Sequence, residues 1–153
     1  MKYESIDSKL FIKNRANFSK EMKKNSIAFF NSNDIYPVSA DSTLPFEQHR
    51  DIFYLSGIDQ EESILVLSPD NPNPDLREIL FLKETSDHIA VWEGPKINKS
   101  QALKISGIKT VFWLNDLEKI INKLVNRCEN IYFNKNEHYR AKIETETREA
   151  RFN

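Results

Sequence analysis

The chain has little cysteine, little glycine and no long uncharged hydrophobic run, and each shortage excludes a class of protein. Cys128 is the single cysteine among 153 residues, so no intramolecular disulfide can form and a reducing compartment is favoured. Three glycines are too few for loops that cradle phosphates. No apolar stretch approaches the ~18 residues of a membrane span, and the N-terminus has no apolar signal core. The sequence therefore predicts a cytoplasmic protein without a membrane partner.

Charged residues are abundant but balanced in sign. Lys and Arg number 22 and Asp and Glu 23, which gives a net charge of -1. The densest basic group comprises Lys13, Arg15, Lys20, Lys23 and Lys24. We interpret this group as the solvated face of a helix rather than as a phosphate-binding patch. The sequence therefore predicts no nucleic-acid partner.

The pattern of apolar residues indicates one mixed α/β domain. Helices are predicted over 7–24, over 100–106 with Gly107 as C-terminal cap, and from Asn115 or Asp116 to about residue 126. Strands are predicted over 26–31, 52–55, 64–67, 78–82, 88–92, 110–114 and 130–133. After residue 134 the sequence is polar on nearly every helical face, which is typical of a helix that bridges domains.

Candidate metal-binding and nucleophilic side chains are sparse. The three histidines, His49, His88 and His138, lie far apart in the sequence, and no pair has the spacing of a zinc-binding helix. His49 and Asp51 are a minimal metal-binding pair, but a role in a surface loop or at a sheet edge is favoured. Cys128 is interpreted as a small buried hydrophobic side chain.

Two tryptophans and one long loop are candidates for contact surfaces. The loop over 31–48 exceeds the length of most structureless connections in compact domains, and such loops are often functional. Trp113 lies within an apolar run and is predicted to be a core residue. Trp92 precedes a Glu-Gly-Pro turn, where core packing is favoured and a partly exposed binding role is the alternative.

The block Ser42–Gly57 reads Ser-Thr-Leu-Pro-Phe-Glu-Gln-His-Arg-Asp-Ile-Phe-Tyr-Leu-Ser-Gly, and Ser63–Ser68 adds Ser-Ile-Leu-Val-Leu-Ser. This block resembles the signature at the start of Xaa-Pro aminopeptidases (aminopeptidase P), in the creatinase/prolidase N-terminal domain. The first helix, the strand in Asn25–Phe30 and the Val-Trp-Glu-Gly segment Val91–Gly94 are similar to family segments in the same order. The resemblance covers nearly the whole chain.

The resemblance implies a mixed six-stranded sheet flanked by helices, with ribonuclease-H-like topology, over residues 1–134. Residues 135–153 would begin a linker helix toward a C-terminal metallopeptidase domain that this chain does not contain. The family releases an N-terminal residue that precedes proline, and a dinuclear site, usually manganese, activates the attacking water. The metal ligands belong to the C-terminal domain. The resemblance therefore implies no catalytic residue, metal ligand or cofactor in this chain, which is expected to be inactive alone.

Two residues take a role from the resemblance. Asp41 and Trp92 match positions that, in dimeric or tetrameric family members, reach toward the active site of a neighbouring subunit, which implies roles in oligomerisation and substrate access. One departure is that Glu47 stands where the family has an arginine, whereas Arg50 adds a cation three residues later. The N-terminal domain of a prolidase or creatinase, and a free-standing binding module without a hydrolase domain, remain open alternatives.

Overall fold

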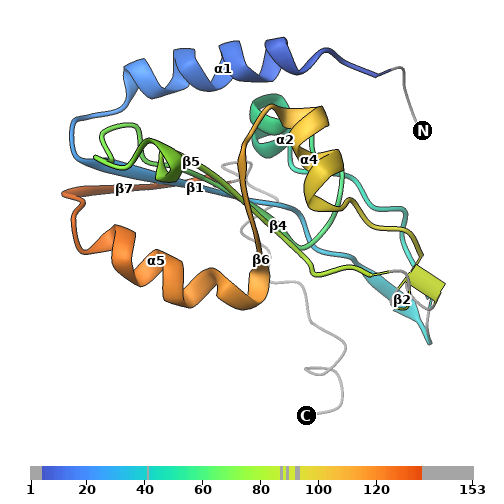
Figure 1. Ribbon diagram of the computed structural model, residues 1–153. Helices are drawn as coiled ribbons and strands as arrows, with labels where there is room; N and C mark the ends of the chain where they lie inside the picture. The colour runs from blue at the N-terminus through green and yellow to red at the C-terminus, as the bar shows by residue number, and fades with distance from the viewer. Residues whose placement is uncertain (1–4, 41, 87, 89, 92–93, 136–153) are drawn as a thin grey trace.

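The computed structural model describes residues 5–40, 42–86, 88, 90–91 and 94–135. Its described elements form a central sheet with helices on both faces (Figure 1). In chain order they are α1 Ser8–Glu21, β1 Ser26–Asn31, β2 Pro37–Ser39, β3 Ser42–Thr43, α2 Arg50–Ser56, β4 Ser63–Leu67, η1 Pro74–Leu76, β5 Glu78–Leu82, α4 Lys99–Ser106, β6 Thr110–Trp113, η2 Leu114–Asp116, α5 Leu117–Val125 and β7 Asn130–Phe133.

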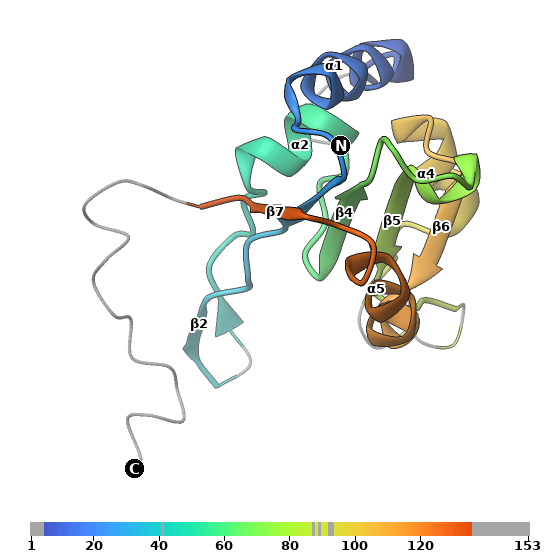
Figure 2. The same cartoon turned by 90° about the vertical axis from the view of Figure 1, so that its left-hand side faces the viewer.

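The main sheet of the described residues has five strands in the order β6-β5-β4-β1-β7 (Figure 2). β4 pairs antiparallel with both β1 and β5, whereas β7 runs parallel to β1 and β6 runs parallel to β5. α4 connects β5 to β6, and α5 connects β6 to β7 across the sheet. The predicted mixed α/β fold, with both sequential and crossover pairing, is confirmed.

Hydrophobic side chains pack on both faces of the sheet. On one face, α1, α2 and α4 cover a cluster that includes Phe30, Ile52 and Ala102. On the other face, α5 covers a cluster that includes Phe29 and Leu124. Consecutive strand residues point to opposite faces, so Phe29 and Phe30 belong to different clusters.

The segment predicted as a strand over 52–55 is the helix α2, and this prediction was wrong. The side chain of His49 accepts a hydrogen bond from the backbone N–H of Asp51 at the start of α2, and Gly57, with φ 71°, ends the helix. Ile52 and Leu55 are both buried, because residues three apart lie on one face of a helix. The main sheet of the described residues has five strands, whereas the family resemblance implied six.

The strand predicted over 88–92 is also wrong where it is described. His88, Ala90 and Val91 have helical conformation, and the backbone N–H of Ala90 donates to the carbonyl of Ser86 at 2.9 Å. Hydrogen bonds four residues apart belong to α-helices and not to strands. The side chain of Val91 is 76% exposed, so it lacks the burial of a core strand.

The other helices and strands predicted before residue 134 are confirmed within a few residues, and the long loop over 31–48 contains the hairpin β2–β3. The predicted start of a linker helix over 135–153 lies, from residue 136 on, outside the described residues. Gly107 ends α4 with φ 74°, as predicted. α5 follows the 3-10 turn η2 and has no side-chain hydrogen bond at its N-terminal cap. Trp113 is half-buried, with Lys99 Nζ 4.6 Å from the centre of its ring. No helix in the described part of the chain is long and apolar enough to cross a membrane.

Arg15 is fully buried, which corrects the interpretation of the basic group as wholly solvated. Its Nε donates to Glu78 Oε2 at 2.9 Å, and its Nη1 donates to the carbonyls of Leu55 and Ser106 at 2.8 and 3.0 Å. These carbonyls belong to the last residues of α2 and α4, where no donor within the helix is available. A positive charge is also favourable at the C-terminus of a helix. Arg15 therefore connects α1 to the ends of two other helices.

Candidate interaction site

β2 and β3 form a separate two-stranded hairpin that projects from the body of the domain (Figures 1 and 2). Pro37 pairs with Thr43 and Ser39 pairs with Ser42. The backbone N–H of Leu44 donates to the carbonyl of Tyr36 at 2.9 Å, which extends the pairing beyond the strands. We call the described residues 35–40 and 42–44 the hairpin arm.

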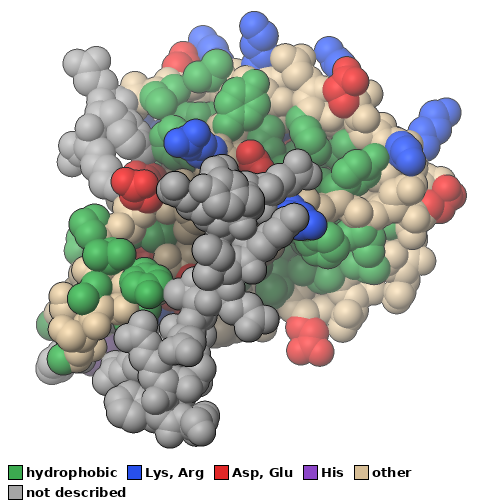
Figure 3. Space-filling view, turned by 180° about the vertical axis from the view of Figure 1, so that it is seen from behind, with side chains coloured by type: hydrophobic (Ala, Val, Ile, Leu, Met, Phe, Trp, Pro, Cys, Tyr) green, Lys and Arg blue, Asp and Glu red, His purple; other side chains and the backbone are tan. Residues whose placement is uncertain are grey.

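Large hydrophobic side chains on the hairpin arm remain exposed. The exposed fractions are 41% for Ile35, 43% for Tyr36, 53% for Val38 and 51% for Leu44. Figure 3 shows hydrophobic side chains gathered on this projection, at the lower left of the view. Grouped apolar side chains on a surface mark contacts with another protein surface, and an isolated two-stranded hairpin is only marginally stable. The arm is therefore suited to pack against a partner.

The side chain of Gln48 attaches the base of the hairpin arm to the turn before β4. Its Oε1 accepts the backbone N–H of Asn33 at 3.4 Å, and its Nε2 donates to the carbonyls of Ile58 and Gln60 at 3.1 and 2.8 Å. One amide thereby holds three separate backbone positions. Gln48 was not among the predicted site residues, because its one local signal is its position between the long loop and the following apolar run.

An open depression lies at the base of the hairpin arm, and its charged lining includes Glu47, Arg50, Asp51 and Lys135. His49 also lines it, with Nδ1 3.7 Å from Asp51 Oδ2. The same Nδ1 accepts the backbone N–H of Asp51 at 3.3 Å. His49 thus caps α2, which agrees with the favoured role in a surface loop.

The described residues do not assemble a metal site. Among them, no group of three or more His, Cys, Asp or Glu side chains could hold a metal ion, and a dinuclear centre needs at least that many ligands. The donors in this part of the chain therefore do not fit such a centre.

Cys128 is half-buried, burial raises the pKa of its thiol, and its Sγ donates to the carbonyl of Leu124 at 3.3 Å. Cys128 packs against the cluster under α5, as expected for a structural side chain, but it is half-buried rather than buried as predicted.

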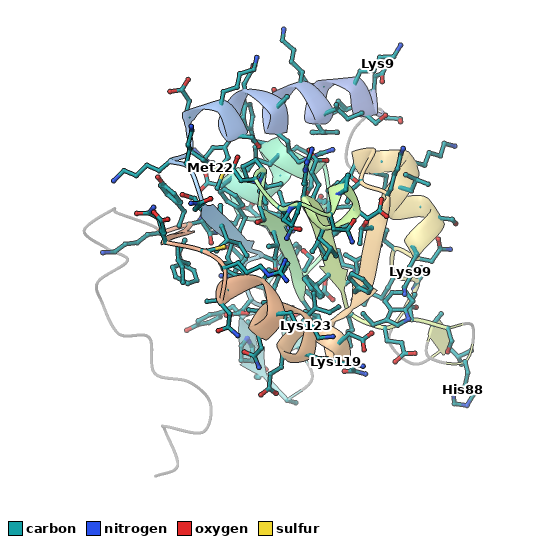
Figure 4. All side chains as sticks on the ribbon, turned by 60° about the vertical axis from the view of Figure 1, so that its left-hand side comes forward. Lys9, Met22, His88, Lys99, Lys119 and Lys123 are labelled. Atoms are coloured by element: carbon teal, nitrogen blue, oxygen red, sulfur yellow. The ribbon has the colours of Figure 1, made fainter. Side chains whose placement is uncertain are left out.

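The segment over 83–97 leaves the sheet after β5 and returns before α4, and two adjacent glutamates hold its ends. Glu62 pairs with Lys83 at 2.9 Å, and Glu61 pairs with Lys96. Burial by itself raises the pKa of Glu61, but the hydrogen bonds from Lys96 and the backbone, with the charges of both lysines, hold it below its ordinary value. His88 lies on this segment and points away from the body of the domain (Figure 4).

The sequence profile described as "Aminopeptidase P, N-terminal domain" matches residues 11–132. The chain belongs to this family. It is 29% identical over 126 residues to Intermediate cleaving peptidase 55 of Saccharomyces cerevisiae, a match that covers 80% of this chain and 24% of the relative. It is 28% identical over 95 residues to Xaa-Pro aminopeptidase 3 of Homo sapiens, with 61% and 19% covered.

Solved structures agree with this assignment. The aminopeptidase P N-terminal domain described here superposes on a putative aminopeptidase P from Bacillus anthracis with a TM-score of 0.81 and 26% identity, over 96% of this chain and 35% of that one. Aminopeptidase PepP of Pseudomonas aeruginosa has the same fold, with a TM-score of 0.78 and 22% identity over 88% and 30%. The chain thus spans 19% to 35% of the lengths of these four proteins.

Both predicted site residues of this aminopeptidase P N-terminal domain, Asp41 and Trp92, lie outside the described residues. Their described neighbours are Ala40, which has φ 45° beside the strands of the hairpin arm, and the exposed Val91. The roles of Asp41 and Trp92 therefore stay predictions.

Proposed function

We propose that this chain is the non-catalytic N-terminal domain of a metal-dependent Xaa-Pro aminopeptidase. The observation that carries the proposal is the family match over residues 11–132, in proteins of which the chain spans a minor part. Residues 1–134 would form the domain, and residues 135–153 would begin the linker to a catalytic domain. A divalent metal centre there, with manganese as the expected ion, would supply an activated water for release of an N-terminal residue that precedes proline.

In this proposal the domain has two tasks, which are contact with a neighbouring subunit in a dimer or tetramer and restriction of access to the catalytic cleft. The hairpin arm supports the first task, because Tyr36, Val38 and Leu44 are exposed on a projecting element. Burial of these apolar side chains against another protein surface is favourable. The second task, restriction of access, follows from the proposed order of domains. A domain that lies beside the catalytic cleft would exclude bulky substrates and admit short peptides with a free N-terminus. A cytoplasmic location is supported by the single cysteine.

The test compares this 153-residue chain with the whole polypeptide that its gene encodes. Release of the N-terminal residue from an Xaa-Pro tripeptide is measured with added Mn²⁺, and bound metal is measured on the same samples. We expect turnover and bound metal for the whole polypeptide, and neither for the chain alone. Turnover by the purified chain would contradict the proposal. So would a whole polypeptide that cleaves Xaa-Pro dipeptides and leaves tripeptides intact, because that result identifies a prolidase.

A further inference from the structure

The helices of the described residues cover the two faces of the sheet unequally. α1, α2 and α4 lie on one face, and α5 lies on the other (Figure 2). β6 and β7 run in the same direction at opposite edges of the sheet. α5 leaves the C-terminal end of β6 through η2 and leads to the N-terminal end of β7. It must therefore cross its face obliquely, and it does not cover the corner where β1 and β7 end.

Hydrophobic side chains occupy this corner, which no helix of the described residues covers. Phe133 is 66% exposed and Ile131 is 46% exposed, and both lie on β7 at the edge of the sheet. Phe133 stacks on the buried ring of Phe29, with centroids 5.5 Å apart and an interplanar angle of 18°. Ile64, which packs against the same cluster, is half-buried at the end of β4 nearest this corner. We call Ile64, Ile131 and Phe133 the corner patch.

The backbone leaves the sheet at a fixed point beside the corner patch. The N–H of Asn134 donates to the carbonyl of Phe29 at 3.2 Å. Its side-chain Nδ2 donates to the carbonyl of Asn31, and its Oδ1 accepts the N–H of Asn31, each at 3.0 Å. The Asn134 amide thus satisfies both backbone groups of Asn31, as another strand residue would. Any polypeptide that follows therefore starts next to Phe133.

We propose that the corner patch is the docking surface for the next domain of the same polypeptide, an inference that rests on the proposed function. Because the chain leaves the sheet beside Phe133, a following domain is tethered near the patch at an effective concentration of roughly millimolar. A modest apolar surface is sufficient at such a concentration. The outer face of α5 is less suited, because Lys119 and Lys123 project from it (Figure 4). A second copy of the chain would have no tether, so we assign the patch to the domain in cis.

Hydrogen exchange tests this docking directly, with the 153-residue chain and the whole polypeptide compared under the same conditions. We expect amides of residues 130–134 to exchange at least tenfold more slowly in the whole polypeptide, because the second domain covers β7. Amides around the exposed Tyr54 of α2, on the opposite face, should exchange equally in both. Equal exchange of residues 130–134 in the two proteins would overturn the proposal.

Matched aromatic truncations separate docking from packing within the domain. Tyr54→Ala is the control for Phe133→Ala, because Tyr54 is 58% exposed and Phe133 66%. We expect Phe133→Ala to lower the thermal midpoint of this domain by about 2–4 °C more in the whole polypeptide than in the isolated chain. Tyr54→Ala should have the same effect in both. If Phe133→Ala also acts equally in both, the ring serves only to cover Phe29 and the proposal is wrong.

Two further results distinguish this inference from the proposed function. A polypeptide that cleaves Xaa-Pro tripeptides while exchange at β7 is unchanged contradicts docking alone. If β7 amides exchange more slowly in the whole polypeptide than in the isolated chain, but the whole polypeptide cleaves no such peptide, the proposed function alone is contradicted. A reading frame that ends at Asn153 contradicts both. Sedimentation of the isolated chain should show a monomer, or a dimer through the hairpin arm that Phe133→Ala leaves intact. A dimer that Phe133→Ala dissociates would identify a second copy as the occupant and overturn the proposal.

Discussion

Arg15 of α1 and Glu78 of β5 form an ion pair in which the guanidinium is fully buried and the carboxylate side chain is 36% exposed. Water can therefore reach Glu78 if Arg15 is removed, but the carbonyls of Leu55 and Ser106 would lose their charged donor. We expect Arg15→Ala to lower the free energy of unfolding by roughly 1–3 kcal/mol for each of these two carbonyls that is left without a donor. Urea denaturation followed by circular dichroism measures this loss.

Two variants control the Arg15 prediction. Lys13→Ala, at an exposed position of the same helix, should change the free energy of unfolding by no more than about 0.5 kcal/mol. Arg15→Lys keeps the charge but not the planar fork of donors, so its stability should lie between those of the wild type and Arg15→Ala. A loss below about 1 kcal/mol for Arg15→Ala would show that the two helix ends do not depend on this side chain.

The Glu61–Lys96 pair should make the stability of the domain depend on pH. Although burial opposes it, the hydrogen bond from Lys96 helps to hold the pKa of Glu61 below its ordinary value of 4.5. A lowered carboxyl pKa contributes stability that is complete above the unfolded-state pKa and is lost as pH falls through the folded-state pKa. We therefore expect the wild type to be more stable than Glu61→Gln at neutral pH, and the difference to shrink as pH falls below 4.5.

Urea denaturation at a series of pH values measures this dependence. Glu62→Gln is the matched control, because Glu62 is the adjacent glutamate and its side chain is 49% exposed in its pair with Lys83. Its effect at neutral pH should be within about 1 kcal/mol. A difference between the wild type and Glu61→Gln that stays constant throughout the acid range would contradict the prediction.

Two glycines with similar backbone conformations separate backbone strain from steric overlap. Gly57 has φ 71°, and a Cβ at this position would overlap the ring of Phe11. Gly94 has φ 78°, but within the described part of the chain no atom lies within 4 Å of its Cβ position. Gly94→Ala should cost about 1–2 kcal/mol through the left-handed conformation alone. Gly57→Ala should lower the free energy of unfolding by more than Gly94→Ala does, as measured by thermal or urea denaturation. Equal losses for the two variants would mean that the ring of Phe11 moves aside without cost.

The hairpin arm should govern the oligomeric state of the whole polypeptide. Val38→Asp places a charge where we propose that another subunit packs, so the subunit dissociation constant should rise at least about tenfold, equivalent to 1.4 kcal/mol. Sedimentation velocity over a range of concentrations measures this change. Tyr54→Asp, at an exposed position outside the arm, should leave the oligomer intact. An oligomer that Val38→Asp does not weaken would rule out the arm as a subunit contact.

Trp92→Ala and Asp41→Asn in the whole polypeptide should impair hydrolysis without loss of folding, because the family resemblance implies that both residues reach a neighbouring active site. We expect kcat/KM on Xaa-Pro peptides to fall about tenfold for Trp92→Ala. Val91→Ala is the control, since this adjacent side chain is exposed. Unchanged kinetics for Trp92→Ala would mean that the neighbouring-subunit role is wrong.

Elements with several agreeing local signals were predictable from the sequence, whereas α2 was not. Asn98 and Gly107 bracket α4 with a capping box and a left-handed residue, and both signals can be read in sequence. α2 has only seven residues, so its core face consists of little more than Ile52 and Leu55. Its run of Ile, Phe, Tyr and Leu has high β propensity. The cap at Gly57 was the better guide to its structure.

The interactions that join distant segments could not be predicted from local patterns. Arg15 donates to carbonyls that lie 40 and 91 positions further along the chain. The residues next to it in the sequence are mostly polar or charged, so they do not indicate that Arg15 is buried. The apolar side chains of the hairpin arm were visible in the sequence, but their exposure depends on where the hairpin projects. The resemblance located the family because it compares the whole order of segments rather than one motif.

The position of Arg15 also has a consequence for how the domain opens. The last turn of a helix ordinarily frays, because its carbonyl groups have no partner and lose little on exposure to water. Here one guanidinium holds the final turns of α2 and α4 together, so neither end can loosen without releasing a buried charge from its acceptors. The two helices should therefore behave as one cooperative unit with α1, and they should be lost together in a single transition rather than one turn at a time.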